Sequence, residues 1–241
     1  HNRVFSYAIV RRSLPYALLI LLMMIYSRVD SVMIERIHPN GAAEAGYYAQ
    51  GFRLLSAFFM FAMLFSNLLF PLFSHMFKSK SDVIPLLSTS SKLLIGSSMA
   101  IAVLCWFNSE YILNLIYTDD VHNSFETFQL LMLSFVGMSA VVIFGTLLTA
   151  KGELKFLNIL SLIGIALNIL INYTLIPVYG AWGAAVATVA TQSSVALIQI
   201  IACARILRLN FSFPLFLRFS TFLLLSGVLC YYFRANSLIS L

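Results

Sequence analysis

Apolar residues run along this chain in seven long stretches that are separated by short polar connections. Most stretches are close to the ~20 residues that an α-helix needs to cross a bilayer, and the second is longer. Long runs of Leu, Phe, Ile and Ala favour helices, whereas a membrane β-barrel would show alternating segments of about ten residues. We therefore predict spans at residues 13–34, 45–73, 90–107, 128–150, 156–178, 181–204 and 215–233.

The composition supports this interpretation. Of the 241 residues, 61% are hydrophobic and 10% are charged, whereas a soluble domain carries roughly a quarter charged residues. Cys105, Cys203 and Cys230 lie within or beside apolar runs and do not suggest a disulfide framework. We predict an all-α integral membrane protein, a bundle of about seven transmembrane helices.

Basic residues gather on one side of the predicted membrane. Eleven precede the first span or follow the second, fourth and sixth spans: Arg3, Arg11, Arg12, Lys78, Lys80, Lys92, Lys151, Lys155, Arg205, Arg208 and Arg218. Outside the spans, the opposite side carries only Arg36 and Arg234. The positive-inside rule therefore predicts a cytoplasmic N-terminus. Topology also accounts for most of the net charge of +6, so no nucleic-acid partner is needed to explain it.

Residues 168–192 contain the most informative polar pattern. They hold the end of one apolar helix, a reversal with Pro and Gly, and the start of a helix of small residues. Asn168 and Asn172 are four residues apart, as are Ala184 and Thr188, so each pair lies on one helical face. Polar groups are costly to bury in a membrane without partners or a function. The hairpin is a candidate ion or solute site, and hydrogen bonding between helices is the alternative role.

The first predicted span carries two charged residues near its outer end. Arg28 and Asp30 are two positions apart, so they point to nearly opposite sides of the helix and are poorly placed to pair. Arg28 either extends to the interface or binds a ligand. Asp30 has a shorter side chain that cannot reach the membrane interface as readily, which makes it the better functional candidate.

The second predicted span carries Arg53, with Gln50 one turn before it and Ser56 one turn after it. Arg binds phosphate and carboxylate in a bidentate manner and stays charged when it is desolvated. In a water-filled cavity Arg53 would suit an anionic lipid head group. The alternatives are an interfacial position and an ion pair with a carboxylate such as Glu44. No catalytic constellation is evident, and we do not expect an enzyme.

Three segments in order resemble the C-terminal lobe of polysaccharide flippases. They are SLPYALLILLMMIYSRVDSVMI (13–34), AGYYAQGFRLLSAFFMFAMLFSNLLFPLFS (45–74) and LLTAKGELKFLNILSLIGIALNILINYTLIPVYGAWGAAVATVATQ (147–192). These proteins export O-antigen, capsule and related lipid-linked oligosaccharides and belong to the multidrug/oligosaccharidyl-lipid/polysaccharide exporter superfamily. The resemblance implies helices seven to thirteen of a two-lobe flippase, with the N-terminal lobe missing from this chain.

The implied domain organisation has three parts. Residues 1–12 would form a cytoplasmic N-terminal segment, and residues 13–204 a six-helix flippase lobe. Residues 205–241 would form a cytoplasmic connection, an additional transmembrane helix and an external tail.

The resemblance also implies a sodium site. In the lipid II flippases of this superfamily, the site joins an acid of the seventh helix, two side chains of the eleventh, and a carbonyl and a threonine of the twelfth. The matching positions here are Asp30, Asn168, Asn172, the carbonyl of Ala184, and Thr188. Asn172 stands where those flippases have an acid, so sodium binding should be weaker, and both Na⁺ and H⁺ stay open as coupling ions.

The function implied is transport of an undecaprenyl-pyrophosphate-linked oligosaccharide across the bacterial cytoplasmic membrane by alternating access. Arg53, Arg28 and Gln50 would bind the substrate, and no cofactor beyond the coupling ion is expected. The expected partners are membrane lipids, the missing lobe, and the polymerase and assembly proteins of polysaccharide synthesis. The alternatives are a multidrug or cation antiporter of the same superfamily, against which cavity arginines argue, and a scaffold of polysaccharide assembly that does not transport.

Overall fold

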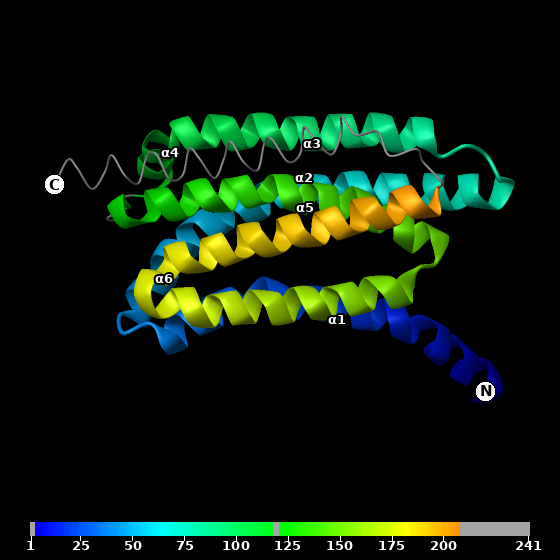
Figure 1. Cartoon of the computed structure of the whole chain (residues 1–241), viewed down its shortest axis with the longest axis horizontal. Helices are drawn as coiled ribbons and strands as arrows, with labels where there is room; N and C mark the ends of the chain where they lie inside the picture. Colours follow the sequence, from blue (N-terminus) through cyan, green and yellow to red (C-terminus); the bar gives the residue numbers. More distant parts are fainter. Residues whose placement is uncertain (1–2, 118–120, 208–241) are drawn as a thin grey trace. The chain divides into compact units, whose positions relative to one another are not determined.

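The computed structural model describes residues 3–117 and 121–207, and the side chains of residues 3–12, 26 and 27 are not described. Within these residues every regular element is a helix, which confirms the predicted all-α class. The elements in chain order are α1 (Arg3–Ile37), α2 (Gly41–Ser79), α3 (Ile84–Phe107), α4 (Ser109–Ile116), η1 (His122–Ser124), α5 (Phe125–Lys151) and α6 (Leu154–Ile206) (Figure 1).

Helices α1, α2, α3, α5 and α6 are long and apolar enough to cross a membrane. Together they contain the first six predicted spans, because α6 covers both residues 156–178 and residues 181–204. The chain is therefore a multi-pass membrane protein. It divides into two compact units at residue 200, and the seventh predicted span lies outside the described residues.

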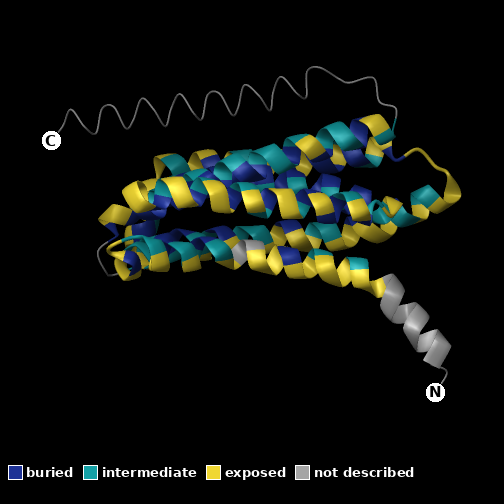
Figure 2. Cartoon of the chain, turned by 60° about the horizontal axis from the view of Figure 1, so that its bottom comes forward, coloured by how far each residue is buried: buried dark blue, intermediate teal, exposed yellow. Residues whose placement is uncertain are grey.

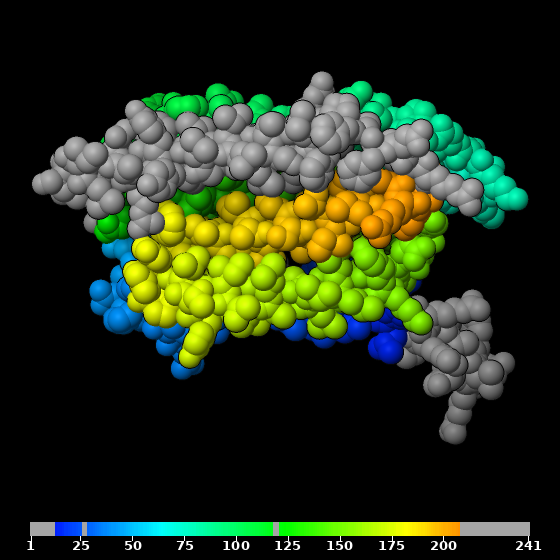
Figure 3. All heavy atoms as spheres, viewed as in Figure 1, coloured from blue at the N-terminus to red at the C-terminus, as the bar shows by residue number. Residues whose placement is uncertain are grey.

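Helix α6 reverses direction at Gly180, where φ is 52° and ψ is −128°. A residue with a Cβ atom is strained in this conformation, whereas glycine adopts it readily. The second half of the helix then folds back on the first half, as Figure 3 shows. The two halves touch closely, since a Cβ atom on Gly183 would lie 2.8 Å from the carbonyl oxygen of Leu175. The hairpin predicted at residues 168–192 is thus present, and it brings the two polar faces together.

Helix α5 forms the core of the first unit. In its most apolar 18-residue window 83% of the residues are buried, compared with 17% in α2 and 33% in α3. Glycines allow its close packing: a Cβ atom on Gly51 of α2 would lie 3.1 Å from Phe128, and one on Gly137 of α5 would lie 3.2 Å from Gln192. Helix α2 and the second half of α6 therefore pack directly on α5, and α3 also contacts α5.

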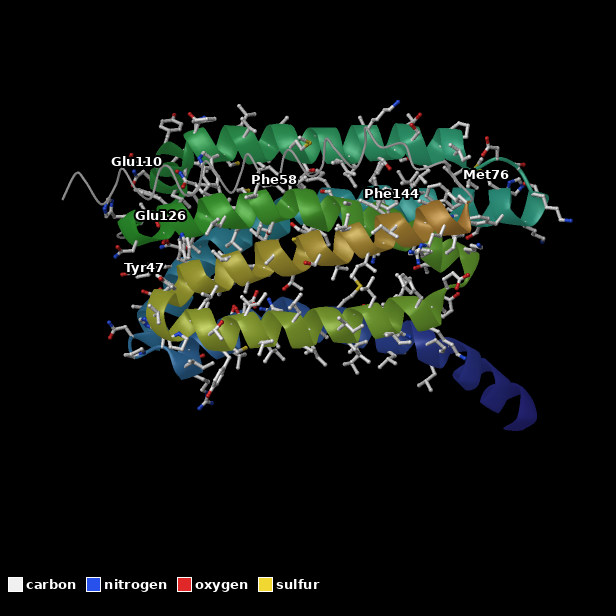
Figure 4. All side chains as sticks on the ribbon, in the orientation of Figure 1. Tyr47, Phe58, Met76, Glu110, Glu126 and Phe144 are labelled. Atoms are coloured by element: carbon white, nitrogen blue, oxygen red, sulfur yellow. The ribbon has the colours of Figure 1, made fainter. Side chains whose placement is uncertain are left out.

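The outward faces of the surrounding helices are largely exposed (Figure 2). Many of the exposed side chains are large and apolar, such as Phe61 (70% exposed), Leu68 (67%) and Phe107 (67%). So many exposed large apolar side chains are unusual on a soluble monomer and suit contact with lipid or with another protein. Figure 4 shows Tyr47, Glu110 and Glu126 at one end of this unit and Met76 at the other. The short helix α4 lies at the Glu110 end.

Candidate functional site

The carboxylate of Asp30 lies inside the bundle at the centre of a buried polar cluster. Only 4% of the residue is exposed. Oδ1 accepts a hydrogen bond from Nδ2 of Asn172 at 2.7 Å, and Oδ2 accepts one from the hydroxyl of Thr188 at 2.7 Å. The hydroxyl of Tyr48 also donates to Oδ2, at 2.8 Å. The acid of α1 is therefore held by α2 and by both halves of α6.

Two further groups extend this arrangement within the α6 hairpin. Nδ2 of Asn172 also donates to Oδ1 of Asn168 at 3.1 Å, and Oγ1 of Thr188 lies 3.1 Å from the carbonyl oxygen of Ala184. The single proton of the Thr188 hydroxyl can serve only one acceptor at a time. The structure thus brings together all five positions predicted for the ion site. We call these five residues and Tyr48 the Asp30 cluster.

The local sequence explains why these groups meet. Asp30 lies seven residues before the end of α1 and Tyr48 seven residues after the start of α2, so both side chains sit about 10 Å inside the helix ends. Asn168 and Asn172 occupy one face of the first half of α6, and Ala184 and Thr188 occupy one face of the second half. The reversal at Gly180 turns these two faces toward each other and toward α1.

Two amide atoms of the cluster have no partner in the described part of the chain. They are Nδ2 of Asn168 and Oδ1 of Asn172, and both residues are fully buried. A buried polar atom without a partner is destabilising by about 1–3 kcal/mol. A half-turn of the Asn172 amide would exchange its oxygen and nitrogen and direct the oxygen toward the carboxylate. That orientation is favourable if a cation lies between the two oxygens, or if Asp30 carries a proton that it donates to the amide oxygen.

The donor set of the Asp30 cluster therefore fits a hard cation. It offers a carboxylate, two amide oxygens, a hydroxyl and a backbone carbonyl, and oxygen ligands of this type suit hard ions. Among the described residues no three His, Cys, Asp or Glu side chains gather as a metal site would require. A set with a single acidic ligand would suit a cation of low charge better than a transition metal.

Sequence reasoning missed two residues of α2 that support this site. Tyr48 was not assigned a role, and Glu44 was considered only as a partner for Arg53. Oε2 of Glu44 accepts a hydrogen bond from the backbone N–H of Ala181 at 2.7 Å. It thereby caps the start of the second half of α6, where the backbone N–H groups attract negative charge.

The Glu44 cap also requires a glycine at position 180, because a Cβ atom there would overlap the Glu44 carboxylate. The pair of Glu44 and Tyr48 could have been noticed from their spacing, since residues four apart share a helical face.

The three residues predicted to bind substrate lie away from the Asp30 cluster. Arg28 is exposed whereas Asp30 is buried, in agreement with the opposite directions expected from the helical period. Arg53 is also exposed, and it lies nine residues after Glu44, about half a helical turn around α2, so the two cannot pair. Gln50 is half-buried, and its Oε1 accepts a hydrogen bond from the hydroxyl of Ser124. Its side chain is thus engaged within the protein.

Comparison with known proteins places these features in a family. Residues 15–174 match the model of the MatE family. The chain belongs to the MatE family. This result confirms the multidrug/oligosaccharidyl-lipid/polysaccharide exporter superfamily, whose MatE members are transporters rather than enzymes, and it does not select the polysaccharide branch. The match covers Asp30, Asn168 and Asn172, whereas Ala184 and Thr188 lie beyond it and join the cluster in the structure.

One curated relative is an uncharacterized membrane protein of Methanocaldococcus jannaschii. It is 28% identical over 205 residues, which cover 84% of this chain and 47% of the relative. This MatE chain therefore spans about half the length of that relative. The search of solved structures found no match to this chain.

Proposed function

We propose that this chain is one lobe of a cation-coupled membrane transporter that flips an undecaprenyl-pyrophosphate-linked oligosaccharide across the cytoplasmic membrane. The observation that carries the proposal is the Asp30 cluster. Its hydrogen bonds come from α2 and from both halves of α6. Any change in the partners of Asp30 therefore acts on α1, α2 and α6 together.

The cluster supports two alternative arrangements. A buried carboxylate needs donors or a counter-ion in every state, because an uncompensated buried charge is destabilising by several kcal/mol. Here three neutral donors compensate Asp30. A cation held by Asp30, Asn168, Asn172, Thr188 and the carbonyl of Ala184 would provide the other form of compensation.

Because the two arrangements differ in which atoms face the carboxylate, a cation would favour one conformation of the helices over another. That difference is the requirement for coupling transport to an ion gradient. Na⁺ is the first candidate because the ligands are all oxygen atoms. H⁺ is the second, since Asp30 by itself could carry a proton.

Two exposed arginines support the proposal that the substrate is anionic. Arg28 and Arg53 present guanidinium groups on the surface of α1 and α2. Arg is well suited to the two phosphates of a pyrophosphate because its planar donors bind oxygen pairs. In the complete transporter we assign Arg53, with support from Arg28, to the head group of the lipid carrier. Gln50 is a weaker candidate because it already bonds Ser124.

The Asp30 cluster also favours a second candidate, a multidrug or cation antiporter of the same superfamily. A single buried acid can exchange an inward-moving cation for an outward-moving cationic drug. The two functions differ in the charge of the transported molecule. In an antiporter, acids at the surface of the cavity would help to bind the cationic drug. In a flippase, Arg53 would help to bind the pyrophosphate of the lipid.

We place the transporter in the cytoplasmic membrane with residues 1–12 on the cytoplasmic side. The support is the distribution of Lys and Arg among the connections. The second lobe, which lies outside this chain in our proposal, would supply the other wall of the substrate path.

The test uses the full-length protein in vesicles that contain a fluorescent pyrophosphate-linked lipid sugar. A quencher added outside reports the fraction of lipid in the outer leaflet. We expect Arg53→Ala to abolish flipping, while Arg36→Ala, which removes an exposed Arg at the end of α1, leaves it unchanged. Normal flipping by the Arg53→Ala protein would remove Arg53 from the mechanism. Efflux of a cationic dye without flipping would support the antiporter. The absence of both flipping and efflux would support the scaffold.

A further inference from the structure

Two adjacent tyrosines at the start of α2 have different surroundings. The ring of Tyr48 is 1% exposed and stacks on Phe52 with centroids 5.7 Å apart and planes inclined by 19°. Its hydroxyl reaches Oδ2 of Asp30 at 2.8 Å. Tyr47 is half-buried and accepts a hydrogen bond from Nδ2 of Asn123 at 3.3 Å. Only Tyr48 therefore connects α2 with the acid of α1.

Tyr48 differs from the other two donors to Asp30 because it does not belong to the predicted cation ligands. To bind a cation, Asn172 must direct its amide oxygen inward, and Thr188 must turn its hydroxyl proton away from the carboxylate. The Ala184 carbonyl, 3.1 Å from Oγ1 of Thr188, has two lone pairs and can accept that proton while it also faces the cation. Of the three donors seen here, Tyr48 is the one that can keep its bond to Asp30 in both arrangements.

We propose that Tyr48 is a positioning residue that holds the Asp30 carboxylate in the orientation required for cation binding. This inference rests on the proposed cation site. Its physical reason is that a carboxylate on a short side chain can still rotate about two bonds, and a hydrogen bond to Oδ2 removes that freedom. Hydrogen-bond partners that orient metal ligands typically contribute roughly 10- to 100-fold to metal affinity.

The surrounding contacts allow the hydroxyl to be tested separately from the packing of α2. One turn before Tyr48, Glu44 binds the N–H of Ala181 at 2.7 Å, so α2 stays attached to the hairpin without the Tyr48 hydroxyl. A Tyr48→Phe substitution also keeps the ring and its stacking on Phe52. The variant therefore removes one donor and leaves the fold in place.

The experiment measures thermal unfolding of the full-length protein at increasing Na⁺ concentration, with choline replacing Na⁺ at constant ionic strength. We expect Tyr48→Phe to raise the half-saturating Na⁺ concentration at least about tenfold. The matched control Tyr47→Phe loses the same hydroxyl from the preceding residue and should stay within about twofold of the unchanged protein. Asp30→Asn should abolish the Na⁺ response.

The outcomes separate this inference from the proposed function. If Asp30→Asn abolishes the response but Tyr48→Phe behaves like Tyr47→Phe, the positioning role is wrong and the cation site stands. If the unchanged protein shows no response to Na⁺, or Asp30→Asn retains it, the sodium site at Asp30 and the positioning role both fail, whereas lipid flipping is decided by the vesicle assay.

The KM for Na⁺ in a transport assay provides a second readout, because the KM does not depend on the amount of folded protein. Tyr48→Phe should raise the KM for Na⁺ by the same factor and keep most of the maximal rate, whereas a purely structural defect would lower the maximal rate alone.

Discussion

Replacing Asn172 with Asp should turn the Asp30 cluster into a stronger and more cation-dependent site. In the present structure the Asn172 amide donates to Oδ1 of Asp30 across 2.7 Å. An Asp at this position would replace the donor with a second carboxylate, and the centres of the two charges would lie about 4 Å apart. At an effective dielectric constant of about 20, two like charges at this distance repel by roughly 4 kcal/mol.

The same charge attracts a cation that lies between the two carboxylates. Without the cation the variant should be less stable than the unchanged protein, and with Na⁺ most of that loss should be recovered. Since about 1.4 kcal/mol corresponds to a tenfold change, 4 kcal/mol is an upper bound near 1,000-fold in affinity. Relaxation of the side chains reduces this value, and we expect Na⁺ to bind roughly 10- to 100-fold more tightly.

The assay is binding of radioactive Na⁺ to the purified full-length protein, combined with thermal unfolding in Na⁺ and in choline. Asn123→Asp is the control, because it makes the same chemical change at an exposed position in η1. The Asn172→Asp protein should melt below the control in choline and approach it in Na⁺. If the two variants melt alike in both salts and bind Na⁺ equally, Asn172 does not face a cation and the assignment of the cluster is wrong.

Two further substitutions test how the cluster is built. Asp30→Ala should destabilise the protein by roughly 1–3 kcal/mol, since it removes the acceptor that Tyr48, Asn172 and Thr188 share, although Asn172 keeps its bond to Asn168 and Thr188 can still donate to the Ala184 carbonyl. Asp30→Asn retains an acceptor and should melt at a clearly higher temperature, and equal melting would contradict the hydrogen bonds to Asp30. Gly180→Ala should be destabilising by more than the ~1–3 kcal/mol expected for backbone strain, because its Cβ atom also meets Glu44. Gly152 also has a positive φ, 91°, although its ψ is 14° and the space around it is open, so an equal loss in the Gly152→Ala variant would show that the Glu44 contact is unimportant.

The membrane spans and the helical faces of the hairpin could be predicted from the sequence. Both depend on patterns that are local in the chain: the length of an apolar run, and the helical period that places residues four apart on one face. For the same reason the opposite directions of Arg28 and Asp30 were predictable, and the structure shows one exposed and the other buried. The five ion-site positions came from the resemblance to a family together with this spacing.

Only the tertiary structure showed which groups of other helices complete the cluster. The roles of Tyr48 and Glu44 depend on the rotation of α2 about its axis and on its position beside α1 and the α6 hairpin. Those quantities result from packing over the whole bundle, including the close approach of α2 to α5 at Gly51. The contact of Gln50 with Ser124 is also decided by packing, because 74 residues separate the two in the chain. A local pattern contains no information about such pairs, whereas the folded helices place their side chains within hydrogen-bond distance.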